Sequence, residues 1–198
     1  GRLGVGDTAD RTTPTQIGAL TSWRQVGAGR DFACATRADS TLWCWGAGWG
    51  GQLGRGSTAD SSAPVQVGAA ADWTRITVGG YSACGVRSAG TLWCWGANGE
   101  GQVGDGTTTN RTSPVQVGSA TDWARASIDE HHACGLRTSG LLWCWGANWN
   151  GQLGDGTATN RSTPTPIGAN TWADVSTGSS HTCAVAAVGG LWCWGNDG

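Results

Sequence analysis

The sequence predicts an all-β repeat protein, and three observations lead to that prediction. A segment of about 50 residues recurs four times along the 198-residue chain. Each copy contains apolar runs of strand length, separated by glycine-rich turns. Each copy also carries one pair of cysteines with nine residues between them. We therefore expect one repeat domain over residues 1–198 and not several unlike domains.

The repeats begin near Trp23, Trp73, Trp123 and Trp172, and the fourth stops after its first half. The missing half stands at the other end of the chain as GRLGVGDTADRTTPTQIG, residues 1–18. Joining the two ends would restore a nearly complete repeat. The sequence therefore predicts that the N- and C-terminal half-repeats complete one unit together.

Each repeat is expected to form four strands, which in the first copy are WRQVGAG, FACATR, TLWCWG and PVQVG. Residues 38–40, 88–90 and 138–140 have the composition of hairpin turns between the second and third strands. Side chains in LWCWG alternate between two faces, and both faces are apolar. Such a strand must be covered on both sides, as in a blade that packs between two others. The prediction is a β-propeller with four four-stranded blades.

Twelve of the 14 tryptophans occupy three positions of the repeat, which predicts that they are packing residues. They are Trp23, Trp73, Trp123 and Trp172; Trp43, Trp93, Trp143 and Trp192; and Trp45, Trp95, Trp145 and Trp194.

The cysteine pairs predict four disulfides, each within one repeat, because a hairpin places the two members of a pair opposite each other. An even number of cysteines in identical pairs favours an oxidising compartment, so we expect a secreted or cell-surface protein. The alternative is eight buried thiols in a cytosolic protein. The pairs are Cys34 and Cys44, Cys84 and Cys94, Cys134 and Cys144, and Cys183 and Cys193.

The formal net charge is −2 and there is no lysine, so no basic field is present to hold nucleic acid. The longest apolar stretches, such as LLWCW, are too short to span a bilayer. No signal peptide is present and the chain opens on Gly1, which favours a processed or excised segment.

The repeated phrase H-[AT]-C-[AG]-L-R…G-x-L-W-C-W-G-x-N-x-x-G-Q-L-G-D-G-T…P-x-x-V resembles the regulator-of-chromosome-condensation repeat. The resemblance covers essentially the whole chain. It implies a β-propeller with four-stranded blades around a central channel, in which strands from both chain ends complete one blade. Propellers of that family usually have seven blades, and this chain has four repeats.

The eponymous members of that family act on a small GTPase and on chromatin. The cysteine pairs, the absence of lysine and the mild acidity of this chain look more like the bacterial extracellular members, some of which inhibit β-lactamases through propeller loops. A β-lactamase inhibitor is therefore one function that the resemblance implies.

Candidate partner-binding residues lie where the repeats differ, because the repeated positions build the scaffold. One variable segment precedes the first cysteine of each pair and contains the only Phe, the only Tyr and all three His. Another follows the Trp-Gly of the third strand and holds the two tryptophans outside the core pattern. The candidates are Arg30, Asp31, Phe32, Tyr81, Asp129, Glu130, His131, His132, His181, Trp49 and Trp149.

Catalysis, cofactors and metals are not expected. Asp129, His131 and His181 could supply some metal ligands, but adjacent strand residues point to opposite faces. His132 and Cys134 have the spacing of a nucleophile pair, but that cysteine is assigned to a disulfide. Asn110 and Asn160 begin N-glycosylation acceptor sequences in the long loop.

Two functions remain open. The first is a non-enzymatic extracellular module that presents variable loops to a protein or glycan. The second is a structural subunit of an oligomer or filament, in which half-blades are shared between copies of the chain.

Overall fold

The short apolar runs of the sequence form fourteen strands and no helix in a computed structural model that describes residues 1–198. The first blade consists of β1 (Trp23–Ala28), β2 (Phe32–Arg37), β3 (Leu42–Gly46) and β4 (Ser61–Gln66). The second consists of β5 (Trp73–Val78), β6 (Ser82–Arg87), β7 (Leu92–Gly96) and β8 (Arg111–Gln116). The remaining strands are β9 (Trp123–Ile128), β10 (His132–Arg137), β11 (Leu141–Gly146), β12 (Arg161–Thr177), β13 (His181–Ala186) and β14 (Leu191–Gly195). Since the chain has no helix, none is long and apolar enough to cross a membrane.

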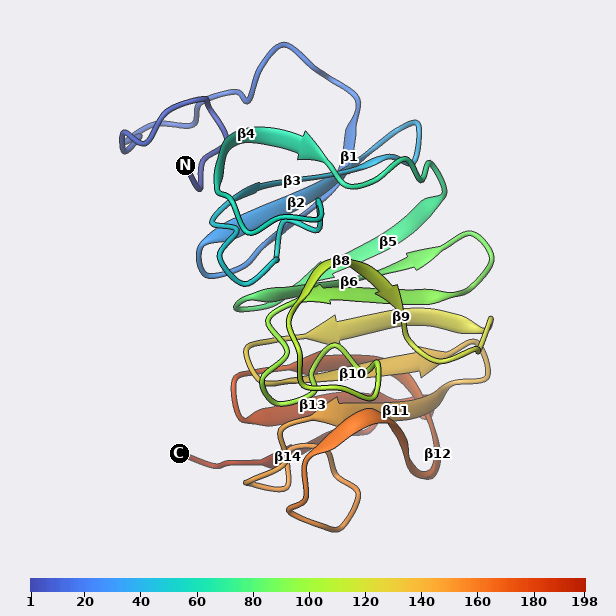
Figure 1. Cartoon of the computed structure of the whole chain (residues 1–198). Helices are drawn as coiled ribbons and strands as arrows, with labels where there is room; N and C mark the ends of the chain where they lie inside the picture. Colours follow the sequence, from blue (N-terminus) through green and yellow to red (C-terminus); the bar gives the residue numbers. More distant parts are fainter.

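All strand pairs are antiparallel, and the blades stack one after another along an open arc (Figure 1). The first two blades are four-stranded sheets in the order β1-β2-β3-β4 and β5-β6-β7-β8. The third and fourth blades form one sheet of six strands, because β12 runs for 17 residues. Its first part pairs with β11 and its second part with β13.

Strand register places the two cysteines of every hairpin directly opposite each other. Cys34 is bonded to Cys44 with a Cα–Cα distance of 4.0 Å. The other three disulfides have the same place in their blades, and no cysteine is free. All four disulfides therefore cross-link hairpins, and none joins two blades.

The hydrophobic core lies between blades, not within them. One cluster combines Leu42 and Cys44 of the first blade with Trp73 and Trp95 of the second. The second tryptophan of each third strand also ties its blade to the preceding repeat: Trp95 Nε1 donates to the Gln52 carbonyl at 2.9 Å. Burial on both faces follows from the doubly apolar LWCWG strands.

The same interblade contact recurs at every blade, and it requires a glycine. Trp145 donates to the Gln102 carbonyl at 2.8 Å. A Cβ on Gly104, whose φ is +80°, would lie 2.6 Å from that indole nitrogen. The repeated glycine therefore allows the loop to approach the indole ring and to adopt a left-handed conformation.

The two half-repeats do not complete a blade together within this chain, contrary to the prediction. β14 is an edge strand, and residues 1–18 lie at the other end of the arc (Figure 1). The reason is the interblade contact: Trp45 Nε1 donates to the Arg2 carbonyl at 2.9 Å, and Gly6 N donates to the Ser62 carbonyl at 2.9 Å. The N-terminal segment thus occupies, on the first blade, the place that residues 51–68 occupy on the second.

The first tryptophan of each third strand is only partly in the core: Trp93 and Trp143 pack against core clusters, as predicted, whereas the fourth blade departs from the prediction. Trp43, Trp93 and Trp143 are half-buried beneath an arginine of the second strand. The fourth blade has Ala186 in place of that arginine, and Trp192 is 56% exposed.

A candidate binding face at the loop end of the blades

Both variable loops of each repeat lie at the same end of the blades. The hairpin between the first and second strands brings residues 29–31, 79–81 and 129–131 there, and residues 47–50, 97–100 and 147–150 follow the third strands. Backbone hydrogen bonds hold the two loops together, from Ala47 N to the Asp31 carbonyl at 2.8 Å and from Ala147 N to the His131 carbonyl at 2.9 Å. We call the surface that they form the loop face; it consists of Arg30, Trp49, Tyr81, Glu130, His131 and Trp149.

One half of the loop face joins side chains from three blades. Trp49 packs against Tyr81 with a centroid distance of 4.9 Å. The Arg30 guanidinium lies 5.5 Å from the centre of the Tyr81 ring. Arg30 Nη1 also lies 3.4 Å from Glu130 Oε1. Aromatic rings and an arginine from different repeats therefore form one continuous surface.

The other half of the loop face is built around His131. Its ring packs edge-on against Trp149 at a centroid distance of 5.4 Å, and its Nε2 lies 4.0 Å from Glu130 Oε2. Gln102 Nε2 fixes the backbone of this loop by donating to the Glu130 carbonyl at 3.1 Å. Glu130 thus links the two halves. Trp49 and Trp149 remain 54% and 50% exposed.

A polar pocket of about 510 Å³ opens beside the loop face, between the inner strands of the blades. Its lining includes Arg30, Ser127, Asp129, Glu130 and Thr177. The strands are joined here by Thr177 N, which donates to Ser127 Oγ at 3.0 Å. Burial raises the pKa of the Asp129 carboxyl.

Two of the predicted partner-binding residues lie in the core. Phe32 is 2% exposed and His132 is fully buried, because their side chains point between blades. His132 Nε2 lies 2.7 Å from Thr182 Oγ1, across the interface between the third and fourth blades. Burial, together with the neighbouring His131 and His181, lowers the pKa of His132 to about 4.

The other candidates are at the surface but outside the two aromatic clusters. Asp31 forms an ion pair with Arg2 at 2.9 Å. His181 is exposed on the fourth blade. No group of three or more His, Cys, Asp or Glu side chains converges as a metal site, so Asp129, His131 and His181 are not brought together. Cys134 is disulfide-bonded, so it is no nucleophile for His132.

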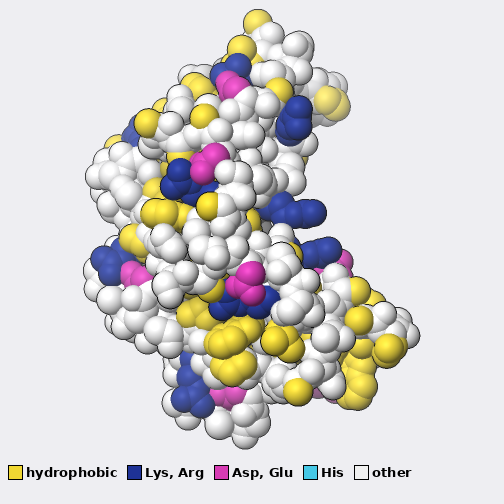
Figure 2. All heavy atoms as spheres, turned by 90° about the vertical axis from the view of Figure 1, so that its right-hand side faces the viewer, with side chains coloured by type: hydrophobic (Ala, Val, Ile, Leu, Met, Phe, Trp, Pro, Cys, Tyr) yellow, Lys and Arg dark blue, Asp and Glu magenta, His cyan; other side chains and the backbone are white.

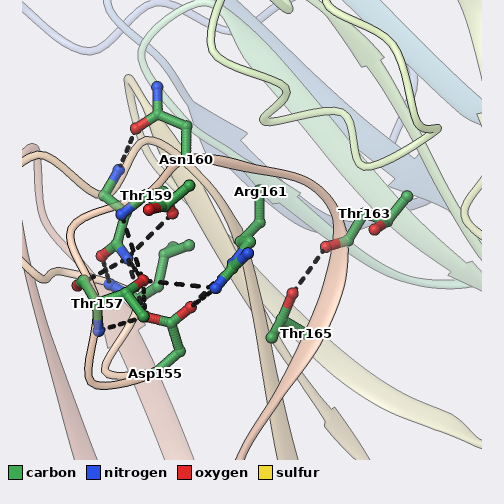
Figure 3. Close-up of polar contacts among 9 residues, drawn as sticks. Asp155, Thr157, Thr159, Asn160, Arg161, Thr163 and Thr165 are labelled. Atoms are coloured by element: carbon green, nitrogen blue, oxygen red, sulfur yellow. Dashed lines mark hydrogen bonds and ion pairs between the residues drawn. The ribbon is translucent and has the colours of Figure 1, made fainter.

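The glycosylation candidates Asn110 and Asn160 form hydrogen bonds that stabilise the long loops. Asn160 Oδ1 accepts a hydrogen bond from Asn148 N at 2.8 Å (Figure 3), and Asn110 Oδ1 accepts one from Asn98 N at 2.9 Å. Asn160 Nδ2, the atom that would carry a glycan, donates to Glu100 Oε2 at 2.9 Å. Their use as glycosylation sites remains a prediction.

The first strands of the four blades, β1, β5, β9 and the second part of β12, are the inner strands of the arc. The sequence analysis did not identify a row of variable residues on these strands, two positions after the tryptophan of each. The row reads Gln25, Arg75, Arg125 and Asp174. Variation at one position of an otherwise regular repeat is the signal that could have found it. Gln25, Arg75 and Arg125 line one small cavity.

Three segments of the chain, residues 39–86, 89–136 and 139–185, match the model of the regulator of chromosome condensation (RCC1) repeat. A second model of the same repeat matches residues 73–102. The chain therefore belongs to the RCC1 repeat family. A search of curated protein sequences gives no match.

Three solved structures with a similar fold are each about twice as long as this chain. Human WBSCR16 has a TM-score of 0.83 at 20% identity, over 98% of this chain and 55% of that one. Prp20p of Saccharomyces cerevisiae has a TM-score of 0.81 at 23% identity, over 93% of this chain and 48% of that one. Yeast RCC1 (Prp20) bound to Kap60 has a TM-score of 0.77 at 22% identity, over 92% and 45%. The chain thus spans about half the length of these relatives.

Proposed function

We propose that this protein is a non-enzymatic, extracellular binding module that recognises a protein partner through the loop face. The observation that carries the proposal is the gathering of Trp49, Tyr81, Arg30 and Trp149 from different blades on one exposed surface. Trp, Tyr and Arg are the residue types that dominate binding energy at protein interfaces. The cross-linked hairpins hold these loops rigidly, which reduces the entropy lost on binding.

Two further observations support this proposal. Four intrachain disulfides suit an oxidising, extracellular compartment. The yeast relatives are described with protein partners, namely Kap60 in one structure and Gsp1p and histones in the other. The same fold therefore binds proteins in those relatives. The residues of the loop face are inferred from this chain alone.

Substitution of the two tryptophans of the loop face tests the proposal. W49A and W149A are expected to weaken binding of the partner isolated from the extracellular medium by about tenfold or more each. W192A is the matched control. Trp192 is 56% exposed, but it lies near the start of β14, at the end of the strand away from the loop face. W192A is expected to change the affinity less than about twofold. Equal losses in all three variants, or capture of a glycan and no protein, would contradict the proposal.

A second candidate function is self-association, which one observation favours. β14 is an edge strand that pairs only with β13, and Leu191 on it is 72% exposed. Residues 11–16 match the fourth-strand sequences 61–66, 111–116 and 161–166 without forming a strand. A fourth strand from another copy would pair with β14 as β4 pairs with β3.

Analytical ultracentrifugation tests this second candidate. Association is expected to increase with concentration, and L191K is expected to abolish it, because a charged edge strand opposes strand addition. A wild-type chain that stays monomeric at all concentrations, or an L191K variant that assembles equally well, would reject it.

A further inference from the structure

The inner strands carry a row of polar side chains that runs across all four blades. β1, β5, β9 and the second part of β12 lie side by side along the inner edge of the arc. Gln25 Oε1 accepts a hydrogen bond from Ile76 N of the next blade at 3.2 Å. Arg125 forms an ion pair with Asp174 of the blade that follows. Arg75 stands between these two interblade contacts.

Arg75 is unusual among the arginines of this chain because it has no partner. The chain has twelve arginines, and all but Arg24 and Arg75 form an ion pair or a hydrogen bond to a backbone carbonyl. Both exceptions lie on inner strands and are exposed. Figure 2 shows basic side chains, in dark blue, projecting at the hollowed right-hand edge of the molecule. They are arginines, because the chain has no lysine.

A small cavity of about 80 Å³ lies against Arg75. Gln25, Thr77 and Arg125 also line it, together with apolar side chains of the second blade, to which Arg75 itself belongs. Two guanidinium groups therefore border one cavity, and the only carboxylate in the row, that of Asp174, is already paired with Arg125. Like charges on neighbouring strands repel each other. The row thus carries an excess positive charge without a counterion.

Gln25 adds a second free donor. Its carbonyl oxygen accepts the Ile76 N–H, whereas its amide nitrogen makes no hydrogen bond within the chain. An arginine fork beside an amide N–H matches a planar group with two acceptor oxygens. The pairing of Arg125 with Asp174 shows that a carboxylate is accommodated one blade further along the same row.

We propose that Arg75, with Gln25 and Arg125, forms a binding site for a carboxylate group on the inner edge of the arc. The group is presented by an acidic peptide segment, which a concave edge accommodates, or by a free small carboxylate. The site does not depend on the loop face, so a ligand at one place leaves the other open.

Titration of the whole chain with three probes tests the site. Hexaglutamate, acetate and inorganic phosphate are added separately, and binding is followed by calorimetry and by NMR of the side-chain amides and guanidinium groups. Hexaglutamate is expected to bind and to shift the Gln25 amide resonances, and acetate is expected to compete at higher concentration. Binding of acetate as tight as that of the peptide would assign the site to a small carboxylate. Phosphate binding more tightly than both, or no binding of any probe, would overturn the proposal.

Variants separate this site from general charge attraction. R75Q is expected to weaken hexaglutamate binding about tenfold or more, because it removes a charge-assisted hydrogen bond. R75K keeps the charge and loses the fork, so an intermediate loss is expected. R24Q is the matched control, since Arg24 is exposed and unpaired but does not line the cavity. Equal losses in R24Q and R75Q would refute a specific site. W49A is expected to leave the hexaglutamate titration unchanged, because Trp49 does not line the cavity.

Discussion

His132 shows how one residue can fit the repeated sequence and still behave differently from its counterparts. The same position holds Phe32, Ser82 and His181 in the other blades. His132 is fully buried and His181 is exposed. The sequence placed both among the partner-binding candidates, because the segment before the first cysteine of each pair differs between repeats. Burial depends on whether a further blade covers the side chain, and no local pattern contains that information.

The low pKa of His132 predicts a loss of stability in acid. Its pKa is about 4 in the folded chain and 6.5 for an unperturbed histidine, so the unfolded state binds the proton more readily. Stability is present above pH 6.5 and falls as the pH drops toward 4, by about 3 kcal/mol in total. H132F, which copies Phe32, is expected to remove most of this fall.

Urea unfolding of wild type and H132F at pH 7 and pH 4 measures the effect. H181F is the control, because it makes the same substitution at the equivalent position of the fourth blade, where the side chain is exposed. A difference between the two pH values that is the same in wild type and H132F would show that other groups cause the acid loss.

At the scale of the element, the long loop after the third strand is ordered by one buried asparagine in the second and third blades, Asn98 and Asn148. Asn148 is fully buried, and its Nδ2 donates to Asp155 Oδ1 and the Thr157 carbonyl, each at 3.0 Å. Its Oδ1 accepts from Leu153 N at 3.0 Å. Although burial raises the pKa of Asp155, hydrogen bonds from Thr157 and Arg161 lower it to about 2. The loop therefore has a polar core of its own (Figure 3).

N148A is expected to lower the free energy of unfolding by about 2–4 kcal/mol, because several buried groups lose their partner together. T165A is the matched control in the same segment, since Thr165 is only half-buried and its hydroxyl donates only to the Thr163 carbonyl, at 3.3 Å (Figure 3). It is expected to change stability by less than about 0.5 kcal/mol. Chemical denaturation of both variants measures the two values. A loss in N148A no larger than in T165A would show that the asparagine network contributes little.

The strands and disulfides were predictable from the sequence because their determinants are local. Alternation in LWCWG and the turn residues at 38–40 fix the hairpin, and the hairpin fixes the Cys34–Cys44 register. The loop face was predictable in part. The variable positions indicated Tyr81, His131, Trp49 and Trp149, but the packing of Trp49 on Tyr81 joins two blades. Contacts between blades depend on how blades stack, which the pattern of one repeat does not specify.

At the scale of the whole molecule, the chain is an open arc, and its two ends were the least predictable part. Sequence complementarity of the two half-repeats suggested that they meet. The contact between Trp45 and the Arg2 carbonyl holds residues 1–18 against the first blade instead. The chain spans about half the length of WBSCR16 and Prp20p, so the arc corresponds to part of those longer chains.

The arc places the two proposed sites on different parts of the surface. The loop face lies at one end of the strands, and the carboxylate site lies along the inner edge. One partner could contact both only by wrapping from the face into the hollow. Separate variants, W49A for the face and R75Q for the inner edge, distinguish one extended interface from two independent ones.

Site-specific photo-cross-linking tests whether a protein partner binds the loop face. A photoreactive phenylalanine analogue replaces Trp49 in one sample and Trp192 in another, and both are illuminated in the extracellular medium of the source cells. We expect one cross-linked protein from position 49 that is absent from position 192 and is displaced by excess unlabelled chain. Cross-links from position 192 and none from position 49 would contradict it.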